Sequence, residues 1–448
     1  MKILKQNNFT FLLVNVACFT LILKTYYSNY NIVSAIILII LGFYVANYYK
    51  NKFSYFTSAI GSFSFMWLFT IGLACLQLNH KQVNWQVETW TCLILAYAFA
   101  VIGNFLGSKF KKNINISSKE ISKSCFFSFV ITLFGLVIVS LITEIVLNRG
   151  NLPAFSDDMS SYANFGVGII HYFTICCAFV PSSCYIYYKS YKISAEEKLL
   201  LIIMSVMSLL IPILIVSRQL IIVTIVISIL TYIKFNLKDE KKILILLFVL
   251  IFGAWFLVGG LRNQNDGYLR YALNINDEDT KYMSVKSMQA YMYIALNYDN
   301  FNINVGQNAE YGYGYGINSV YPIFGLLRIK KLMPQELFEM PLQLKRIISV
   351  YNTYPSVQTP YMDGRILGVV IYFFIIGIIA SRIDKMDKDK PFEIFLSVII
   401  KNCLIFSFFS CWLSRPNWWF YIIILFLLCR IFFKDRKLPR EEKEWEKK

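Results

Sequence analysis

The residues best suited to chemistry in this sequence are arginines at the ends of long apolar segments. Arg218 lies in "ILIVSRQLIIVTI", Arg262 in "VGGLRNQND" and Arg415 in "CWLSRPNWW". A charge in hydrocarbon costs roughly 3 kcal/mol on insertion scales, so each arginine needs either access to water or a partner. A guanidinium binds two phosphate oxygens at once, and such pairs are stronger at a membrane edge than in water. The three arginines therefore predict an anionic ligand, such as one that carries a phosphate group. The alternative for any one of them is a side chain that reaches lipid headgroups.

One carboxylate stands at the mouth of an apolar segment. Asp363 in "YMDGRILG" follows Tyr361 and precedes Arg365. A carboxylate at such an interface can act as a general base, and it can equally cap the helix that begins there. The sequence leaves both roles open. The other carboxylates of the extramembrane segments lie in hydrophilic sequence and are mostly expected in water: Asp157, Asp158, Asp266, Asp277, Glu278, Asp279, Asp299 and Glu310.

Glycines alternate with tyrosines before this segment, in "AEYGYGYGINSVYPIFGLLRIKK". Tyr313 and Tyr315 belong to the alternation, and Arg328 ends the apolar stretch that follows. Aromatic rings pack against the C–H faces of sugars, and phenol hydroxyls bond their polar edges. The pattern is equally typical of a turn of low complexity. It therefore predicts either a glycan-binding rim or a simple connection.

Metal ligands and nucleophile sets are not evident in the sequence. There are two histidines, His80 and His171, and the second is expected to be a hydrogen-bonded core residue. The ten cysteines all lie in or at the ends of apolar segments, which indicates neither a disulfide framework nor a zinc site. No G-x-x-x-x-G-K-[ST] occurs, which argues against ATP-driven chemistry. We expect metal-independent chemistry without a cofactor, in which arginines stabilise negative charge.

The composition indicates the elements that position these residues. Of 448 residues, 57% are hydrophobic and only 16% are charged, which is typical of an integral membrane protein. A bilayer core about 30 Å thick requires ~20 apolar residues per helix. Such segments predict an all-α, polytopic fold with about twelve transmembrane helices, near residues 8–24, 31–48, 55–78, 88–108, 124–147, 165–188, 198–216, 218–233, 243–261, 366–381, 391–413 and 416–433.

The location of the charges sets the expected topology. A net charge of +17 could indicate nucleic acid binding in a soluble domain, but here lysines and arginines concentrate in alternate loops and at both termini. The positive-inside rule then places both termini in the cytoplasm. The loop that connects the seventh and eighth expected helices at Arg218 becomes exoplasmic, and no nucleic acid partner is expected.

One long segment between the expected helices should carry the function. The domain organisation expected is helices one to nine in 1–261, an exoplasmic loop in 262–365, helices ten to twelve in 366–433 and a charged cytoplasmic tail in 434–448. In "KYMSVKSMQAYMYIALN", Val285, Met288, Met292 and Ala295 recur at helical spacing, which predicts an amphipathic helix against the membrane surface. "MPQELFEMP" predicts a second short helix.

The combination of "IVSRQLII" at a loop, "YGYGYGINSVYPIFGLLR" and "VYNTYPSVQTPYMDGRILGVVIYFFIIGII" resembles the Wzy-type oligosaccharide repeat-unit polymerases. In that family a Y-G-x-S/T segment precedes an apolar run ending in Pro-Arg, followed by an N-x-Y/F-T-like stretch and Y-x-D-F-G-x-x-G. Here Leu327-Arg328 replaces Pro-Arg, and Asp363-Gly364-Arg365 with Gly368 replaces the last motif. The resemblance extends from about residue 199 to residue 377.

The resemblance implies a membrane glycosyltransferase of the bacterial plasma (inner) membrane. It would polymerise repeat units on undecaprenyl diphosphate at the outer face by inverting transfer, making O-antigen, capsule or another cell-envelope polysaccharide. The partners implied are lipid-linked donor and acceptor, the bilayer, a chain-length regulator and a flippase. In this account Arg218, Arg262 and Arg415 bind diphosphate and Asp363 deprotonates or orients the acceptor hydroxyl. Glycan is held by Arg328, Tyr313, Tyr315, Asn318, Asn352, Tyr361 and Arg365.

Two other classes share part of this pattern. An O-antigen ligase transfers finished glycan by similar chemistry, but ligases carry a histidine in the long external loop, and this loop has none. A polysaccharide flippase or other transporter is expected to have charges in a central cavity and short loops on both sides. Lys401, inside an expected helix, would suit a transporter, although a lysine there can also extend to the cytoplasmic surface.

Overall fold

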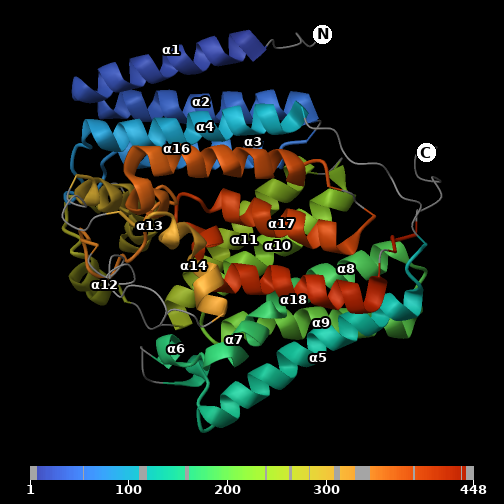
Figure 1. Ribbon diagram of the computed structural model, residues 1–448. Helices are drawn as coiled ribbons and strands as arrows, with labels where there is room; N and C mark the ends of the chain where they lie inside the picture. The colour runs from blue at the N-terminus through green and yellow to red at the C-terminus, as the bar shows by residue number, and fades with distance from the viewer. Residues whose placement is uncertain are drawn as a thin grey trace. The chain divides into compact units, whose positions relative to one another are not determined.

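The computed structural model describes residues 8–53, 55–109, 119–156, 161–237, 240–261, 265–281, 283–306, 313–327, 344–386, 389–434 and 436–439. The regular elements of these residues are helices, which confirms the all-α expectation. The chain divides into two compact units (Figure 1). Unit 1 comprises residues 1–111, 266–385 and 403–416, and unit 2 comprises residues 112–265, 386–402 and 417–448. Both units are therefore built from segments distant in sequence.

Nine helical segments among the described residues are long and apolar enough to cross a membrane, so the chain is a multi-pass membrane protein. They are Asn8–Tyr27, Asn31–Phe53, Val87–Lys109, Lys123–Leu147, Gly168–Ser190, Ala195–Leu214, Arg218–Phe235, Gln358–Ile383 and Pro416–Phe433. Three of the twelve expected spans are shorter. α3 (Ala59–Cys75) has 17 residues and α17 (Pro391–Ile405) has 15. In α11 (Glu240–Leu261) the apolar stretch found is Lys242–Ile251.

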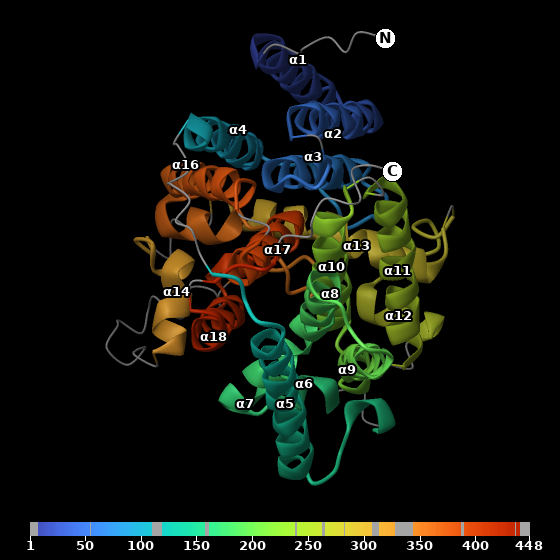
Figure 2. The ribbon, with the colours of Figure 1, turned by 90° about the vertical axis from the view of Figure 1, so that its right-hand side faces the viewer.

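Unit 1 contains the helices that precede residue 112, among them α3, and the helices of the expected loop. Its remaining elements are α1 (Asn8–Tyr27), α2 (Asn31–Phe53), α4 (Val87–Lys109), α12 (Asp266–Leu273), α13 (Val285–Asn304), α14 (Ile317–Leu326), α16 (Gln358–Ile383) and the 3-10 turn η7 (Trp412–Ser414). Figures 1 and 2 show α16 alongside α4, with α2 alongside α3.

Two glycines allow the close packing of α4 and α16. A Cβ on Gly103 would lie 2.1 Å from the Phe374 carbonyl oxygen, and a Cβ on Gly377 would lie 2.1 Å from the Ala100 carbonyl oxygen. Side chains larger than hydrogen would force the two backbones apart. Small residues that permit such approach are a common basis of helix association in membranes.

The helix α13 confirms one expected element and corrects its location. Val285, Met288, Met292 and Ala295 lie on it as the spacing predicted, but each is at most 4% exposed and packed inside unit 1. The expectation that this face lies on the membrane surface was wrong. The opposite face is also buried, because its polar side chains bind neighbouring backbone. The second expected loop helix, in 333–341, lies outside the described residues.

Unit 2 contains α5 (Lys123–Leu147), α6 (Ser161–Asn164), α7 (Gly168–Thr174), α8 (Val180–Ser190), α9 (Ala195–Leu214), α10 (Arg218–Phe235), α11, most of α17 and α18 (Pro416–Phe433), with the 3-10 turns η1 (Pro153–Phe155) and η2 (Ile175–Phe179).

The apolar run around Arg218 is two helices joined by a tight turn, as predicted. Val216 adopts a φ of 52°, and Ser217 caps α10 by accepting a hydrogen bond from the Leu220 amide. His171 is hydrogen-bonded to the buried Glu144, 3.0 Å from Nδ1 to Oε1.

Candidate functional site

The tyrosine-glycine segment and the segment around Asp363 lie against each other in unit 1. The amide of Gly314 donates to the Met362 carbonyl, and the amide of Tyr315 donates to the Asp363 carbonyl, each at 3.0 Å. A Cβ on Gly314 would lie 2.5 Å from Asp363 Oδ1, so glycine is required for this approach. The two motifs that carry the resemblance are therefore one structural cluster. We call Tyr313, Gly314, Asn318, Ser319, Tyr361, Asp363 and Arg365 the Asp363 cluster.

The Asp363 carboxylate binds the first turn of α14. Oδ1 accepts hydrogen bonds from the Asn318 amide and side chain, both at 2.9 Å. Oδ2 accepts from the Ser319 amide at 2.8 Å and from its hydroxyl at 2.6 Å. A carboxylate offers about four lone-pair sites, and all are used. The capping alternative thus applies to α14, since Asp363 itself lies inside α16.

This geometry disfavours Asp363 as a general base. Asp363 is buried, with 6% of its surface exposed. Taking a proton from a sugar hydroxyl would require at least one of the four hydrogen bonds to break. A side chain that holds a helix N-terminus in this way instead fixes the positions of its neighbours.

Arg365 lies in a break of α16. Gly364 and Arg365 have non-helical backbone angles, and Arg365 has a φ of 54° and ψ of −140°. Positive φ is uncommon for residues with a Cβ and often marks functional positions. The predicted helix beginning at residue 366 corresponds to the segment after this break.

The Arg365 guanidinium lies between two tyrosine rings. Its carbon is 5.5 Å from the ring centroid of Tyr313 and 5.4 Å from that of Tyr361. Such cation–π contacts contribute about 0.5–2 kcal/mol each and restrict the orientation of the guanidinium. Arg365 is partly exposed, Tyr313 is exposed, and the ring of Tyr315, whose residue is 81% exposed, lies 6.0 Å from that of Tyr313. The Arg365 guanidinium is therefore an oriented cation beside the accessible phenols of Tyr313 and its neighbour Tyr315.

Tyr361 connects this arginine to a carboxylate on another helix. Its hydroxyl donates to Glu88 Oε1 at 2.7 Å and accepts from the Gly306 amide at 3.2 Å. The ring is fully buried and packs edge-on against Phe301. Glu88 is in the first turn of α4 and is partly exposed.

A run of buried polar side chains on α13 positions the segments around the cluster. Asn302 Oδ1 accepts from the Gln86 amide at 2.8 Å and from the Thr89 hydroxyl at 2.7 Å, next to the start of α4. Asn300 donates to the carbonyls of Tyr351 and Thr353 at 3.0 and 3.1 Å. The run explains why α13 has no solvent face, since buried backbone groups need these partners.

Asp299 is the charged member of this run, and it corrects the expectation that such loop carboxylates are in water. It is fully buried, and its oxygens accept from Trp85 Nε1 at 2.8 Å and from Gln82 Nε2 at 3.0 Å. Burial raises the pKa of Asp299 to about 7, against the lowering effect of its hydrogen bonds. This carboxyl therefore titrates in the physiological range.

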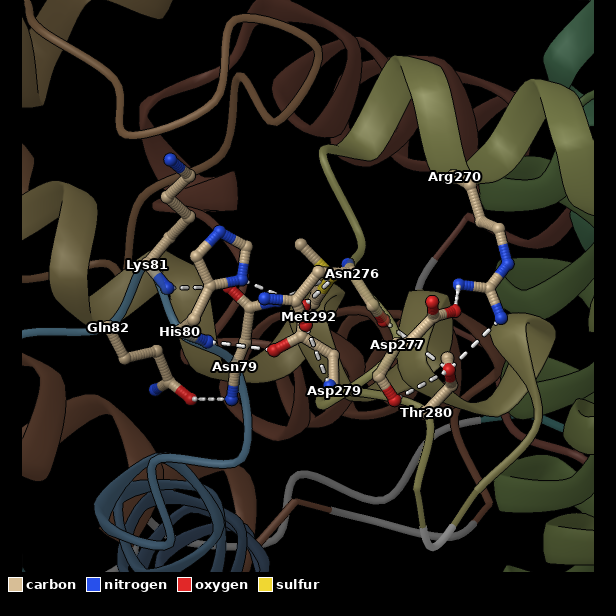
Figure 3. A network of polar contacts seen from close by, with 10 residues as sticks. All are labelled: Asn79, His80, Lys81, Gln82, Arg270, Asn276, Asp277, Asp279, Thr280 and Met292. Carbon is tan, nitrogen blue, oxygen red and sulfur yellow. Dashed lines mark hydrogen bonds and ion pairs between the residues drawn. The ribbon is translucent and has the colours of Figure 1, made fainter.

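A second polar network ties the short segment after α3 to the long loop (Figure 3). His80 donates its backbone amide to Asp279 Oδ1, and its Nδ1 lies 2.8 Å from Asp279 Oδ2. The amide of Asn276 also donates to Asp279 Oδ2 at 3.0 Å. Asp279 is 6% exposed, so it too differs from the expectation of a solvated carboxylate. Arg270 binds Asp277 and Thr280 nearby.

The remaining predicted residues lie in different places. Arg262 and Arg328 are outside the described residues. Arg218 belongs to unit 2 and is 8% exposed, against our expectation of access to water at a rim. A Cβ on Gly259 of α11 would lie 3.3 Å from Arg218 Nη2, so the guanidinium lies against that helix.

Arg415 and Asn352 belong to unit 1 but not to the cluster. Arg415 is exposed, and the neighbouring Pro416 packs against Gly325 near the end of α14, whose first turn holds Asp363. Asn352 is exposed between two residues that bind Asn300. Sequence reasoning missed Glu88 and Ser319. A carboxylate in the first turn of an expected helix was the available signal for Glu88.

Among the residues that the structure describes, no three His, Cys, Asp or Glu side chains are grouped so that they could hold a metal ion. No protein-family description matches the chain, and no curated protein or solved structure shows significant similarity to it.

Proposed function

We propose that this chain is a membrane glycosyltransferase that polymerises oligosaccharide repeat units carried on undecaprenyl diphosphate. The observation that carries the proposal is the Asp363 cluster. Two segments that resemble the repeat-unit polymerases in sequence are joined by six hydrogen bonds, two through backbone and four through Asp363, and they present Arg365 between Tyr313 and Tyr361.

The chemistry of the proposed reaction matches what the cluster offers. The acceptor hydroxyl attacks the anomeric carbon of the donor, and the lipid diphosphate leaves with the electron pair of the broken C–O bond. Positive charge develops on the sugar and negative charge on the diphosphate. An arginine whose orientation is fixed beforehand stabilises such developing charge without rearrangement. Exposed tyrosine rings provide flat surfaces for sugar rings.

In this proposal the arginines have different roles. Arg365 contacts the diphosphate or the adjacent sugar, and the exposed Arg415 provides a second cation in the same unit. Asp363 is a positioning residue, because its oxygens hold α14. The buried Arg218 also becomes a positioning residue, at the α9–α10 turn. Arg262 and Arg328 keep the diphosphate and glycan roles expected from the sequence, and the outer face of a bacterial plasma membrane remains the proposed location.

Substitution of Arg365 tests this function. In a strain deleted for the gene, Arg365→Ala is expected to leave surface glycan as single repeat units, since transition-state charge is no longer stabilised. Arg365→Lys keeps the charge but loses the planar fork and should give only short chains. Arg346→Ala, which removes an exposed arginine of the same unit, is the matched control and should give normal chain lengths. Full-length chains from Arg365→Ala at normal protein levels would refute the proposal.

A ligase-like glycan transferase is the second candidate, and one observation favours it. His80 is oriented by Asp279 through an Nδ1–Oδ2 contact of 2.8 Å, an arrangement that suits a base. Polymerase deletion leaves single capped units, whereas ligase deletion leaves long chains that are not attached to their final acceptor. The glycan of the deletion strain therefore decides between the two functions.

A further inference from the structure

The carboxylate of Glu88 accepts fewer hydrogen bonds than the carboxylate of Asp363 does. Among the described residues, the hydroxyl of Tyr361 is the one hydrogen-bond donor to the Glu88 carboxylate, and it uses Oε1. Asp363 receives four hydrogen bonds. An ionised carboxylate has about four acceptor sites, so Glu88 retains capacity to accept a proton. Its residue is partly exposed, whereas Asp363 is buried.

Glu88 is also linked through Tyr361 to the arginine of the Asp363 cluster. The guanidinium carbon of Arg365 lies 5.4 Å from the ring centroid of Tyr361, and the hydroxyl of Tyr361 donates a hydrogen bond to Glu88. The buried side chain of Tyr361 thus contacts both a carboxylate and a guanidinium. In a glycosyl transfer one group must accept the proton of the attacking hydroxyl and another must stabilise the leaving diphosphate.

The position of Glu88 is fixed from three directions. Asn302 of α13 binds the Gln86 amide and the Thr89 hydroxyl on either side of it. The packing of Gly103 against Gly377 sets the distance between α4, which carries Glu88, and α16. Gly306, just after α13, donates to the same Tyr361 hydroxyl. Catalytic groups need such support, because small errors in position reduce rates strongly.

We propose that Glu88 is the general base of the transfer reaction, which rests on the function proposed above. Glu88 Oε1 accepts a hydrogen bond from the Tyr361 hydroxyl, and this bond holds the carboxylate in place. Oε2 takes the proton of the acceptor sugar hydroxyl as its oxygen bonds to the anomeric carbon. The bond from that carbon to the diphosphate oxygen breaks, and the diphosphate leaves as the anion. The proton passes from Glu88 to water after the step.

The experiment uses the full-length protein in liposomes with lipid-linked repeat units, and it measures the polymerisation rate against pH and substrate concentration. Glu88→Gln is expected to lower kcat on the order of 100-fold or more with little change in KM. It should also abolish the acidic limb of the pH–rate profile. Glu88→Asp should keep that limb at a reduced rate. Tyr361→Phe should lower kcat by about tenfold, because Glu88 loses the hydrogen bond that orients its carboxylate.

Glu196→Gln is the matched control, because Glu196 occupies the same position in the first turn of α9 and is exposed. It should leave the rate and the pH profile unchanged. A Glu88→Gln rate within threefold of wild type, or a lower rate with an unchanged acidic limb, would overturn the proposal. If Glu88→Gln does not fold, rates within threefold of wild type in both Glu88→Asp and Tyr361→Phe would overturn it equally. Wild-type protein that forms no polymer at any pH would instead refute the proposed function.

Discussion

Asp363 and Glu88 show how two carboxylates near one tyrosine can have different uses. The sequence singled out Asp363 because an apolar segment follows it, and in the structure Asp363 lies in α16 just before the break at Gly364. Its donors, Asn318 and Ser319, lie about 45 residues earlier in the chain, so the saturation of its oxygens was not predictable. Glu88 received no attention because its neighbour Tyr361 is 273 residues away in sequence.

Asp299 should make the stability of unit 1 depend on pH. Its pKa is about 7 in the folded chain and about 4 in an unfolded one, so the folded state binds the proton more tightly. This contribution is fully present below about pH 4 and is lost as the pH rises to about 7. Thermal unfolding in detergent should therefore occur at a lower temperature at pH 8 than at pH 5.

Asp299→Asn removes the titrating group and should flatten this profile between pH 5 and pH 8, whatever its effect on absolute stability. The exposed Asp277 provides the control, because Asp277→Asn should leave the pH dependence as in the wild type. A wild-type unfolding temperature that does not change over this range would contradict the assignment.

At the level of elements, the contact of α4 with α16 decides where Glu88 lies relative to Tyr361. Gly103→Ala should destabilise the protein by about 1–3 kcal/mol, because its Cβ would overlap the Phe374 carbonyl. It should also lower activity by displacing Glu88. Gly135→Ala is the control, since a Cβ on Gly135 of α5 meets nothing within 4 Å. Alanine is the better helix former by up to about 1 kcal/mol, so this change should be neutral or stabilising.

Thermal unfolding of the two variants in the same detergent gives the comparison. Opposite signs are expected, and equal effects would mean that the two helices do not approach as closely as the geometry indicates. The sequence alone did not show this contact. Gly103 and Gly107 have the spacing of small residues that favours helix association, but the pattern does not identify the partner helix.

Helical periodicity predicted α13 correctly but not its burial. Val285, Met288, Met292 and Ala295 form an apolar face, and a surface helix would leave the other face in water. In the structure that other face carries asparagines that bind backbone of 344–353 and of the segment before α4. Asparagine is common at the surface, so its type gave no indication of these buried roles.

Over the whole molecule, hydropathy predicted the class of the protein and the location of most long helices. All nine membrane-spanning candidates among the described residues coincide with expected spans. Three of the twelve expected spans are not among these nine, and α17 is one of them, because it ends at Ile405 whereas the expected span ends at residue 413. The 3-10 turn η7 follows instead, and a hydropathy window does not detect such a change of direction.

The composition of the two units could not be predicted either. Unit 1 joins α1–α4 to α12–α14 and α16, and unit 2 contains the helices between α4 and α12. Apolar patterns indicate which faces are buried, but not which helix covers them. The proposed site lies in unit 1, so we expect the chemistry to depend on residues of that unit between positions 88 and 365.

The most direct test of the central claim is reconstitution of the purified protein in liposomes with lipid-linked repeat units isolated from a strain deleted for the gene. The wild type is expected to form, in the presence of EDTA, a ladder of glycan products spaced by one repeat unit, and Arg365→Ala is expected to lose it. Two results would contradict the proposed polymerase function: repeat units that remain single with the wild-type protein, or a ladder that Arg365→Ala forms equally well.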